Sequence, residues 1–349
     1  MRMGRHHLVK SFEAGKMDKT TLISEMLKFH FGRKIFCSDG EDGALAAVGI
    51  DPVTRQLTAL GVRSSRFFGK TVYLPFSTVI DATGDGITLN VTRADVAQSS
   101  STPPPVALLD NKSVVQLADE ATRGTLLIVA VQPGSGELAY LVAHHVRAGQ
   151  DTLLRQEFIT VLETGRVMVN IPEATLQALP PYRPDSELQQ EVENILFDLT
   201  PLHVDFKGMK VRVLDSVLYL DGNISSSLRG DIVQDQAQGV EGLLEIKNRL
   251  VGDDTLAGDL ALALARDPRT PDLPIGVYPR LGTVRLSGAV HTAQQKAAAE
   301  EIARSFPGVR SVVSDLVINP NTDILYVMSA AEGGEAEDKI PGKYIRHTK

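Results

Sequence analysis

Hydrophobic and polar positions follow two different patterns along this chain. Between residues 33 and 96, short runs rich in aliphatic residues alternate with turn residues such as Asp39-Gly40 and Asp85-Gly86. This spacing favours the short strands of a small barrel. The expected strands lie at 44–50, 57–62, 71–74 and 87–91. From Asp185, a plausible helix N-cap, apolar positions take helical and strand spacing in turn, which predicts alternating helices and strands.

The second half of the chain contains a repeat with a constant offset of sixty-six residues. VLYLDG at 217–222 returns as TVRLSG at 283–288, and GLLEI at 242–246 returns as GVRSV at 308–312. A gapless repeat of this length predicts duplicated structural units. Each copy is expected to run αββαβ, with hairpins at 209–214 with 217–224 and 275–279 with 283–290, helices at 227–238 and 292–305, and closing strands at 243–251 and 309–318.

The first half repeats less cleanly, at an offset near eighty-one. Gly43, Val48, Pro52, Leu57 and Leu60 match Gly124, Val129, Pro133, Leu138 and Leu141. The sequence thus predicts an α+β multidomain protein in which two small β-barrels precede two αββαβ units. The expected boundaries are a basic, partly helical leader at 1–32, barrels at 33–98 and 106–179, a Ser/Pro linker at 99–105, a Pro linker at 180–184, αββαβ units at 185–252 and 253–320, and a disordered tail at 321–349.

Composition narrows the partners that this chain can have. The net charge of −7, the absence of Trp and an aromatic content of 5% argue against a nucleic-acid surface, so no direct DNA contact is expected and RNA is unlikely. The single cysteine, Cys37, excludes an internal disulfide and a Cys-based zinc site. No apolar run is long enough to span a bilayer. The expected compartment is the cytoplasm.

Candidate chemical motifs have structural explanations. The acidic group around Asp42 lacks calcium-loop spacing, because Ile50 stands where the closing glutamate is needed. His144 and His145 are adjacent in an expected strand, so their side chains should lie on opposite faces and cannot share one ion. No nucleophile–base motif occurs. The sequence therefore predicts no enzyme, no cofactor and no metal.

Four glycines recur at the repeat offset and are expected to be structural. Gly222 and Gly288 are expected to close a strand where the chain turns toward a helix. Gly242 and Gly308 follow a helix, where a positive φ is common.

The duplicated αββαβ unit resembles the BON domain, on the strand–Gly pattern and on the later Gly242-Leu243 and Gly308-Val309 pairs. The upstream half resembles tandem PRC-barrel domains through the stretches at 43–54 and 72–79. The BON resemblance implies interaction with membrane phospholipid. The PRC-barrel resemblance implies docking modules for proteins.

Three functional hypotheses remain open. The first is a non-enzymatic adaptor that binds a phospholipid surface peripherally, at the inner face of the membrane. Residues 185–320 hold roughly thirteen Lys/Arg against twenty Asp/Glu, so the leader is the expected contact. Its candidate membrane-binding residues are Arg2, Arg5, Lys10, Lys16, Lys19, Leu22, Met26 and Phe29. The second hypothesis is a soluble scaffold, stress-related or ribonucleoprotein-associated, that binds a protein partner through the barrels. The third is an enzyme with a site between domains.

Overall fold

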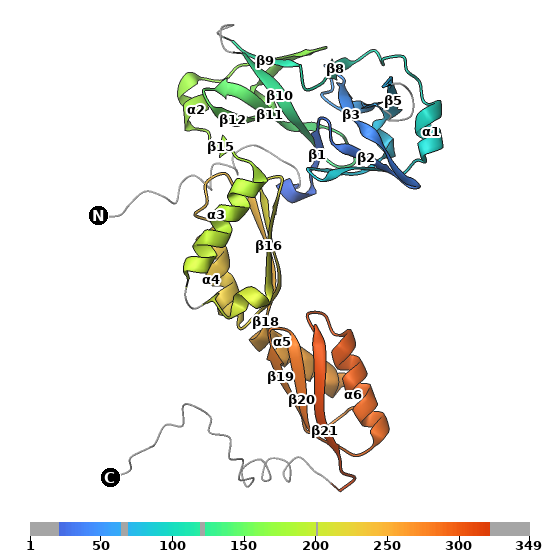
Figure 1. Cartoon of the computed structure of the whole chain (residues 1–349), viewed down its shortest axis with the longest axis vertical. Helices are drawn as coiled ribbons and strands as arrows, with labels where there is room; N and C mark the ends of the chain where they lie inside the picture. The colour runs from blue at the N-terminus through green and yellow to red at the C-terminus, as the bar shows by residue number, and fades with distance from the viewer. Residues whose placement is uncertain (1–20, 64–68, 119–122, 200–201, 322–349) are drawn as a thin grey trace, which may run out of the picture. The chain divides into compact units, whose positions relative to one another are not determined.

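The structure is a computed structural model that describes residues 21–63, 69–118, 123–199 and 202–321 (Figure 1). Sheets predominate in it and helices are few, which confirms the α+β class. The chain divides into two compact units. The first comprises Met1–Ile195, Val211–Tyr219 and Gln236–Lys247, and the second comprises Leu196–Lys210, Leu220–Asp235 and Asn248–Lys349.

The first unit contains two curved sheets of similar design. One sheet has seven strands in the order β5-β4-β3-β2-β7-β6, with β8 added against β3. Its strands are β2 (Lys34–Cys37), β3 (Gly40–Ile50), β4 (Leu57–Arg63), β5 (Thr71–Pro75), β6 (Val79–Thr83), β7 (Gly86–Leu89) and β8 (Ala107–Leu109), and the helix α1 (Arg93–Gln98) follows β7. The four strands predicted in this region are present in the structure.

The other sheet has eight strands in the order β13-β14-β9-β10-β11-β12-β15, with β1 added against β10. Its strands are β1 (Leu27–His30), β9 (Val114–Leu117), β10 (Arg123–Val131), β11 (Leu138–Arg147), β12 (Gln150–Arg155), β13 (Ile159–Glu163), β14 (Arg166–Val169) and β15 (Pro181–Tyr182), and α2 (Glu173–Ala178) lies between the last two.

The two sheets exchange their first strands reciprocally. In β1, Phe29 pairs with Val129 of the second sheet, and in β8, Leu109 pairs with Val48 of the first. Leu109 follows Phe29 by 80 residues and Val129 follows Val48 by 81 residues, so both pairings are related by about the offset of the internal repeat. The turn residues Gln56 and Glu137, which are also equivalent, bridge each other. The two halves are therefore interlocked.

One apolar core runs through both sheets. It includes Phe29 and Ile35 together with Leu60, Leu141 and Val169, all within 1% of complete burial. Arg55 fixes the junction by donating from its guanidinium to the carbonyls of Gln156 and Ile159 at 3.0 and 2.7 Å. A core drawn from both halves predicts that neither half is stable without the other.

The prediction that the leader is partly helical is wrong for residues 22–29. Only Ile23–Glu25 forms a short 3-10 turn, and Leu27–His30 is a strand. The local pattern is amphipathic, but pairing with β10 satisfies the backbone and buries Leu27 and Phe29, so tertiary context overrides it. Residues 1–20 lie outside the described part of the chain.

The αββαβ order appears twice, as predicted. The first copy comprises α3 (Asp185–Asp198), β16 (Met209–Leu214), β17 (Val217–Ile224), α4 (Ser227–Ala237) and β18 (Glu245–Gly252), with sheet order β16-β17-β18. The second comprises α5 (Asp253–Arg266), β19 (Ile275–Arg280), β20 (Thr283–Val290), α6 (Ala293–Ser305) and β21 (Ser311–Ile318), with order β19-β20-β21. Thr292 begins α6 with a reciprocal capping box to Gln295.

In both copies an aspartate at the start of the first helix holds the hairpin turn. The Asp185 carboxylate accepts from the backbone N–H groups of Asp215 and Ser216 at 2.8 Å. Asp185 is expected from the sequence to be the N-cap of α3, but it is the first residue of that helix and its carboxylate binds the turn instead. Asp253 accepts from Leu281 at 2.7 Å in the same way. Asp215, Ser216 and Leu281 all have positive φ, which the carboxylate stabilises by binding the turn amides.

The repeated glycines have positive φ, but two of them lie elsewhere than expected. Gly222 and Gly288 lie inside β17 and β20 rather than at a strand end. A Cβ on Gly288 would collide with the carbonyl oxygen of Pro274, the residue immediately before β19. Gly242 and Gly308 lie after α4 and α6 with φ of 102° and 88°. Gly222 and Gly288 therefore require glycine because another backbone segment approaches them closely.

Candidate functional site

A cluster of largely buried polar groups in the first unit surrounds Asp215. We define the Asp215 cluster as Lys28, His30, Asp215 and the backbone N–H of Gly84. The Asp215 carboxylate is 1% exposed, lies 2.6 Å from His30 Nε2 and 4.0 Å from Lys28 Nζ, and accepts from Gly84 at 3.0 Å. The cluster joins the β16–β17 turn to β1 and to the β6–β7 turn.

Burial sets the protonation behaviour around this cluster. Desolvation lowers the pKa of the Lys28 ammonium, and the nearby Asp215 carboxylate opposes that shift. Desolvation raises the pKa of the Tyr182 phenol, with the charge of Asp215 adding to the increase. The ionisable groups are enclosed and satisfied by one another. We therefore interpret the cluster as a fastening between elements of the first unit rather than as a reaction centre.

Two further side-chain contacts connect residues of β16 and β18 to other parts of the first unit. Glu245 of β18 accepts from Ser24 through the backbone N–H at 2.8 Å and the hydroxyl at 3.0 Å. Arg212 of β16 forms an ion pair with Asp85 of the β6–β7 turn. Sequence reasoning missed this ion pair, since an acidic residue in a turn gives no signal that it will meet an arginine more than a hundred residues away.

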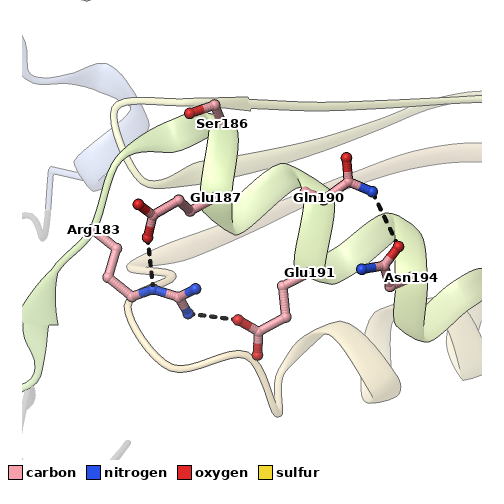
Figure 2. A pocket seen from close by; sticks show the side chains of 6 residues that line it. All are labelled: Arg183, Ser186, Glu187, Gln190, Glu191 and Asn194. Atoms are coloured by element: carbon pink, nitrogen blue, oxygen red, sulfur yellow. Dashed lines mark hydrogen bonds and ion pairs between the residues drawn. The ribbon is translucent and has the colours of Figure 1, made fainter.

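An open depression lies along α3 (Figure 2). Arg183 extends into it and is held between Glu187 at 3.9 Å and Glu191 at 2.6 Å. Its guanidinium also donates to the Glu241 carbonyl at 3.1 Å. The only lining cation is thus already neutralised by carboxylates, which leaves little attraction for an anionic ligand. We interpret this group as a clamp between the proline linker and α3.

The two adjacent histidines do not alternate as the strand pattern predicts. Their ring centroids lie 3.6 Å apart, because β11 is irregular between Ala143 and Arg147 and His145 has φ of 61°. His144 contacts Asp151 through Nδ1. The prediction of opposite faces is therefore wrong, and the cause is a bulge that the sequence did not signal. Within the described ranges, no three metal-ligating side chains gather into a candidate metal site.

In the second copy, the strand alternation leaves one side of the β19-β20-β21 sheet exposed. We define the open face as the side chains that point away from α5 and α6: Tyr278, Arg280, Thr283, Arg285, Ser311, Val313, Asp315 and Val317. Tyr278 and Val317 are 60% and 62% exposed. Arg285 and Asp315 form an ion pair across β20 and β21 at 3.0 Å.

The predicted membrane-binding residues are only partly described. Arg2, Arg5, Lys10, Lys16 and Lys19 lie outside the described residues. Leu22 is exposed, whereas Met26 and Phe29 are buried in the protein. A buried side chain cannot enter a lipid surface, so the structure contradicts that role for Met26 and Phe29. Among the described helices, none has the length and apolar character needed to cross a bilayer.

Comparison with known proteins places a family on part of the chain. Residues 252–320 match the family model of the BON domain. Osmotically-inducible protein Y of Escherichia coli (strain K12) is 26% identical over 159 residues, which cover 41% of this chain and 77% of that protein. The BON resemblance is thus confirmed for the second αββαβ copy. Neither comparison indicates a catalytic family.

Solved structures give weaker similarity. Two chains of CdsD, a structural protein of the type III secretion system of Chlamydia trachomatis, are each 15% identical, with TM-scores of 0.31 and 0.32. They cover 38% and 43% of this chain, and this chain spans 61% and 71% of theirs. Overlap of this extent supports no inference about function.

Proposed function

We propose that this protein is a non-enzymatic adaptor that associates peripherally with a phospholipid membrane and takes part in the response to osmotic stress. The match of residues 252–320 to the BON domain carries the proposal. The similarity to osmotically-inducible protein Y supports the link to osmotic stress. We also propose that the first αββαβ copy is a BON domain and that the two interlocked sheets are PRC barrels.

The structure changes where the membrane contact is expected. The leader was expected to insert an apolar helix, but Met26 and Phe29 belong to the protein interior. The basic residues among 1–20 can still add attraction to an anionic leaflet, at about 1 kcal/mol for each Lys or Arg near the surface. The main contact is then expected within the BON-matched residues.

Co-sedimentation with liposomes tests this function. The full chain is compared with a chain that starts at Thr21, using vesicles of phosphatidylcholine alone and of equal parts phosphatidylcholine and phosphatidylglycerol. A start at Thr21 keeps β1, whereas the deletion of residues 1–32 would remove a strand of the second sheet. We expect salt-sensitive binding of both chains to the anionic vesicles. Absence of binding by the full chain would contradict the proposal.

The alternative function is a protein-interaction scaffold. The contacts of the first copy through the Asp215 cluster and the Arg212–Asp85 pair favour it, because side chains of that copy already bind another folded part of the same chain. A partner that the purified chain captures reproducibly, with or without nuclease, would support this alternative if the liposomes bind nothing. The cytoplasmic location stays a prediction, and cell fractionation tests it.

A further inference from the structure

The second αββαβ copy has two chemically different sides. On one side, Leu256, Leu260 and Leu264 of α5 and Ala299 of α6 pack against strand residues such as Leu286 to form a closed apolar core. On the other side lies the open face, where no helix of the described second copy packs (Figure 1). Since α5 and α6 pack on the same side, the opposite side of the sheet is exposed.

The register shows how the exposed apolar side chains of the open face are arranged across the three strands. Arg285 pairs with Tyr278 on one side and with Val313 on the other, which forms a row across the three strands. Val317 lies two rows away on β21. The ring of Tyr278 lies over Gly276, where a Cβ would come within 2.7 Å of it. Tyr278, Val313 and Val317 thus expose apolar surface on the same side of the sheet, which is a feature of interaction sites.

The charges of this copy are segregated between its two sides. The open face has Arg280 and Arg285 against Asp315, and Arg310 is exposed immediately before β21. The helices α5 and α6 and the loop after α5 hold seven acidic residues against four basic ones. The acidic residues are Asp253, Asp254, Asp259, Asp267, Asp272, Glu300 and Glu301, and the basic residues are Arg266, Arg269, Lys296 and Arg304. The second copy therefore has more acidic than basic residues on its helices and the loop after α5, whereas its open face has more basic than acidic residues.

The equivalent positions of the first copy show what this side of the sheet does there. Arg212 and Glu245, which correspond by the repeat offset to Tyr278 and Ser311, bind Asp85 and Ser24 within the first unit. The second copy has neither ionic group, because Tyr278 stands in place of Arg212 and Ser311 in place of Glu245. Val313 stands in place of Lys247, which pairs with Glu245 in the first copy. The same docking side has changed from a charged to an apolar and aromatic surface.

We infer that the open face is the surface through which this protein lies on an anionic phospholipid leaflet. The inference rests on the proposed function and names the part of the molecule that performs it. Tyr278 and Val317 suit the boundary between headgroups and acyl chains, because an aromatic ring with a polar tip is stable there. Arg280 and Arg310 bind lipid phosphates at its edge, and the acidic helices face away from the leaflet.

Matched charge-reversal variants of the full chain test the inference. The face variant is Arg280→Glu with Arg310→Glu, and the control is Arg266→Glu with Arg304→Glu on the helices. Both pairs change the net charge equally, so they separate a local contact from general attraction. A third variant, Tyr278→Ser with Val317→Ser, removes the apolar contact. Circular dichroism confirms that each protein is folded before co-sedimentation with the phosphatidylglycerol vesicles.

We expect the face variant to bind more than about tenfold more weakly and the control to stay within about threefold of the original chain. The serine variant should lose about tenfold through reduced apolar burial. Equal losses in the face variant and the control would overturn the inference in favour of general electrostatics. Unchanged binding by the face variant would place the contact elsewhere and leave the proposed function standing. If the original chain does not bind, the proposed function itself fails.

Discussion

Replacement of Asp215 by alanine should destabilise the first unit strongly. The change removes the acceptor of the Gly84 N–H at 3.0 Å and the partner of His30 at 2.6 Å. It also leaves the Lys28 ammonium, which is 2% exposed, without its nearest carboxylate. Loss of one partner from a buried charged group costs about 3–5 kcal/mol. We expect the free energy of unfolding of the first unit to fall by that amount.

Lys28 separates the electrostatic part of this effect from the rest. Replacement of Lys28 by methionine keeps the apolar length of the side chain and removes the charge. Because the buried Asp215 carboxylate then keeps His30 and the Gly84 N–H as partners, the single change should cost less than Asp215→Ala. In the Asp215→Ala background it should restore about 1–3 kcal/mol, since no buried ammonium is then left unpaired. Asp215→Asn, which keeps an acceptor for Gly84, should cost less than alanine.

Urea titration read by hydrogen exchange gives the required resolution. A peptide from β10 reports on the first unit, and a peptide from β20 serves as the internal control, because the substitutions should leave it unchanged. The reasoning is refuted if Asp215→Ala lowers the stability of β10 by less than about 1 kcal/mol. It is also refuted if Lys28→Met restores nothing in the double variant.

The same groups make the stability of the first unit depend on pH. Burial lowers the pKa of Lys28 below its value of about 10.4 in the unfolded chain. Between the two pKa values the unfolded chain holds the extra proton, so the free energy of unfolding rises with pH in that window. Burial raises the pKa of Tyr182 above about 10, so its contribution is lost as pH rises beyond that value. The Lys28→Met variant should lack the rise and Tyr182→Phe the decline.

Two further predictions concern the fold. Gly288→Ala should destabilise the second αββαβ copy by about 3 kcal/mol or more in thermal unfolding, because φ is 119° and the added Cβ would meet a carbonyl oxygen. The control Gly258→Ala in α5 should stabilise that copy by up to about 1 kcal/mol. A similar effect of both substitutions would contradict the close backbone approach at Gly288. Deletion of residues 1–20 should leave the amides of β10 protected from hydrogen exchange. Deletion of residues 1–32 should expose these amides, because it removes β1, which pairs with β10. Protection of β10 in both shortened chains would contradict the pairing of β1 with the second sheet.

Local sequence patterns predicted many helices and strands correctly, because the two copies of the repeat indicated the same order of elements. The hairpin 209–214 with 217–224 agrees with the structure residue by residue, and the helix predicted at 292–305 differs only in that Thr292 is its N-cap. In such units the turn chemistry, the caps and the alternation all favour the same elements. The strands of the first sheet were equally visible between their turns.

Non-local contacts account for what the sequence did not show. The segment from Leu22 to Phe29 has the spacing of an amphipathic helix, but β10 lies about a hundred residues later and decides its structure. The bulge at His145 depends on pairing with β12 rather than on a local signal. The open face, in contrast, could have been found in the sequence. Comparison of the copies shows Arg212 replaced by Tyr278 and Lys247 by Val313.

A single fluorescent label tests the membrane account most directly. Cys37 is buried and is the only cysteine, so a Cys37→Ala chain accepts one new cysteine in place of Val317. The fluorescence emission of bimane at position 317 should shift to shorter wavelength when phosphatidylglycerol vesicles are added. Quenchers attached to lipid should also reduce its intensity. A label in place of Gln294 on α6 should show neither change. Equal responses at the two positions, or a response only at Gln294, would contradict the account.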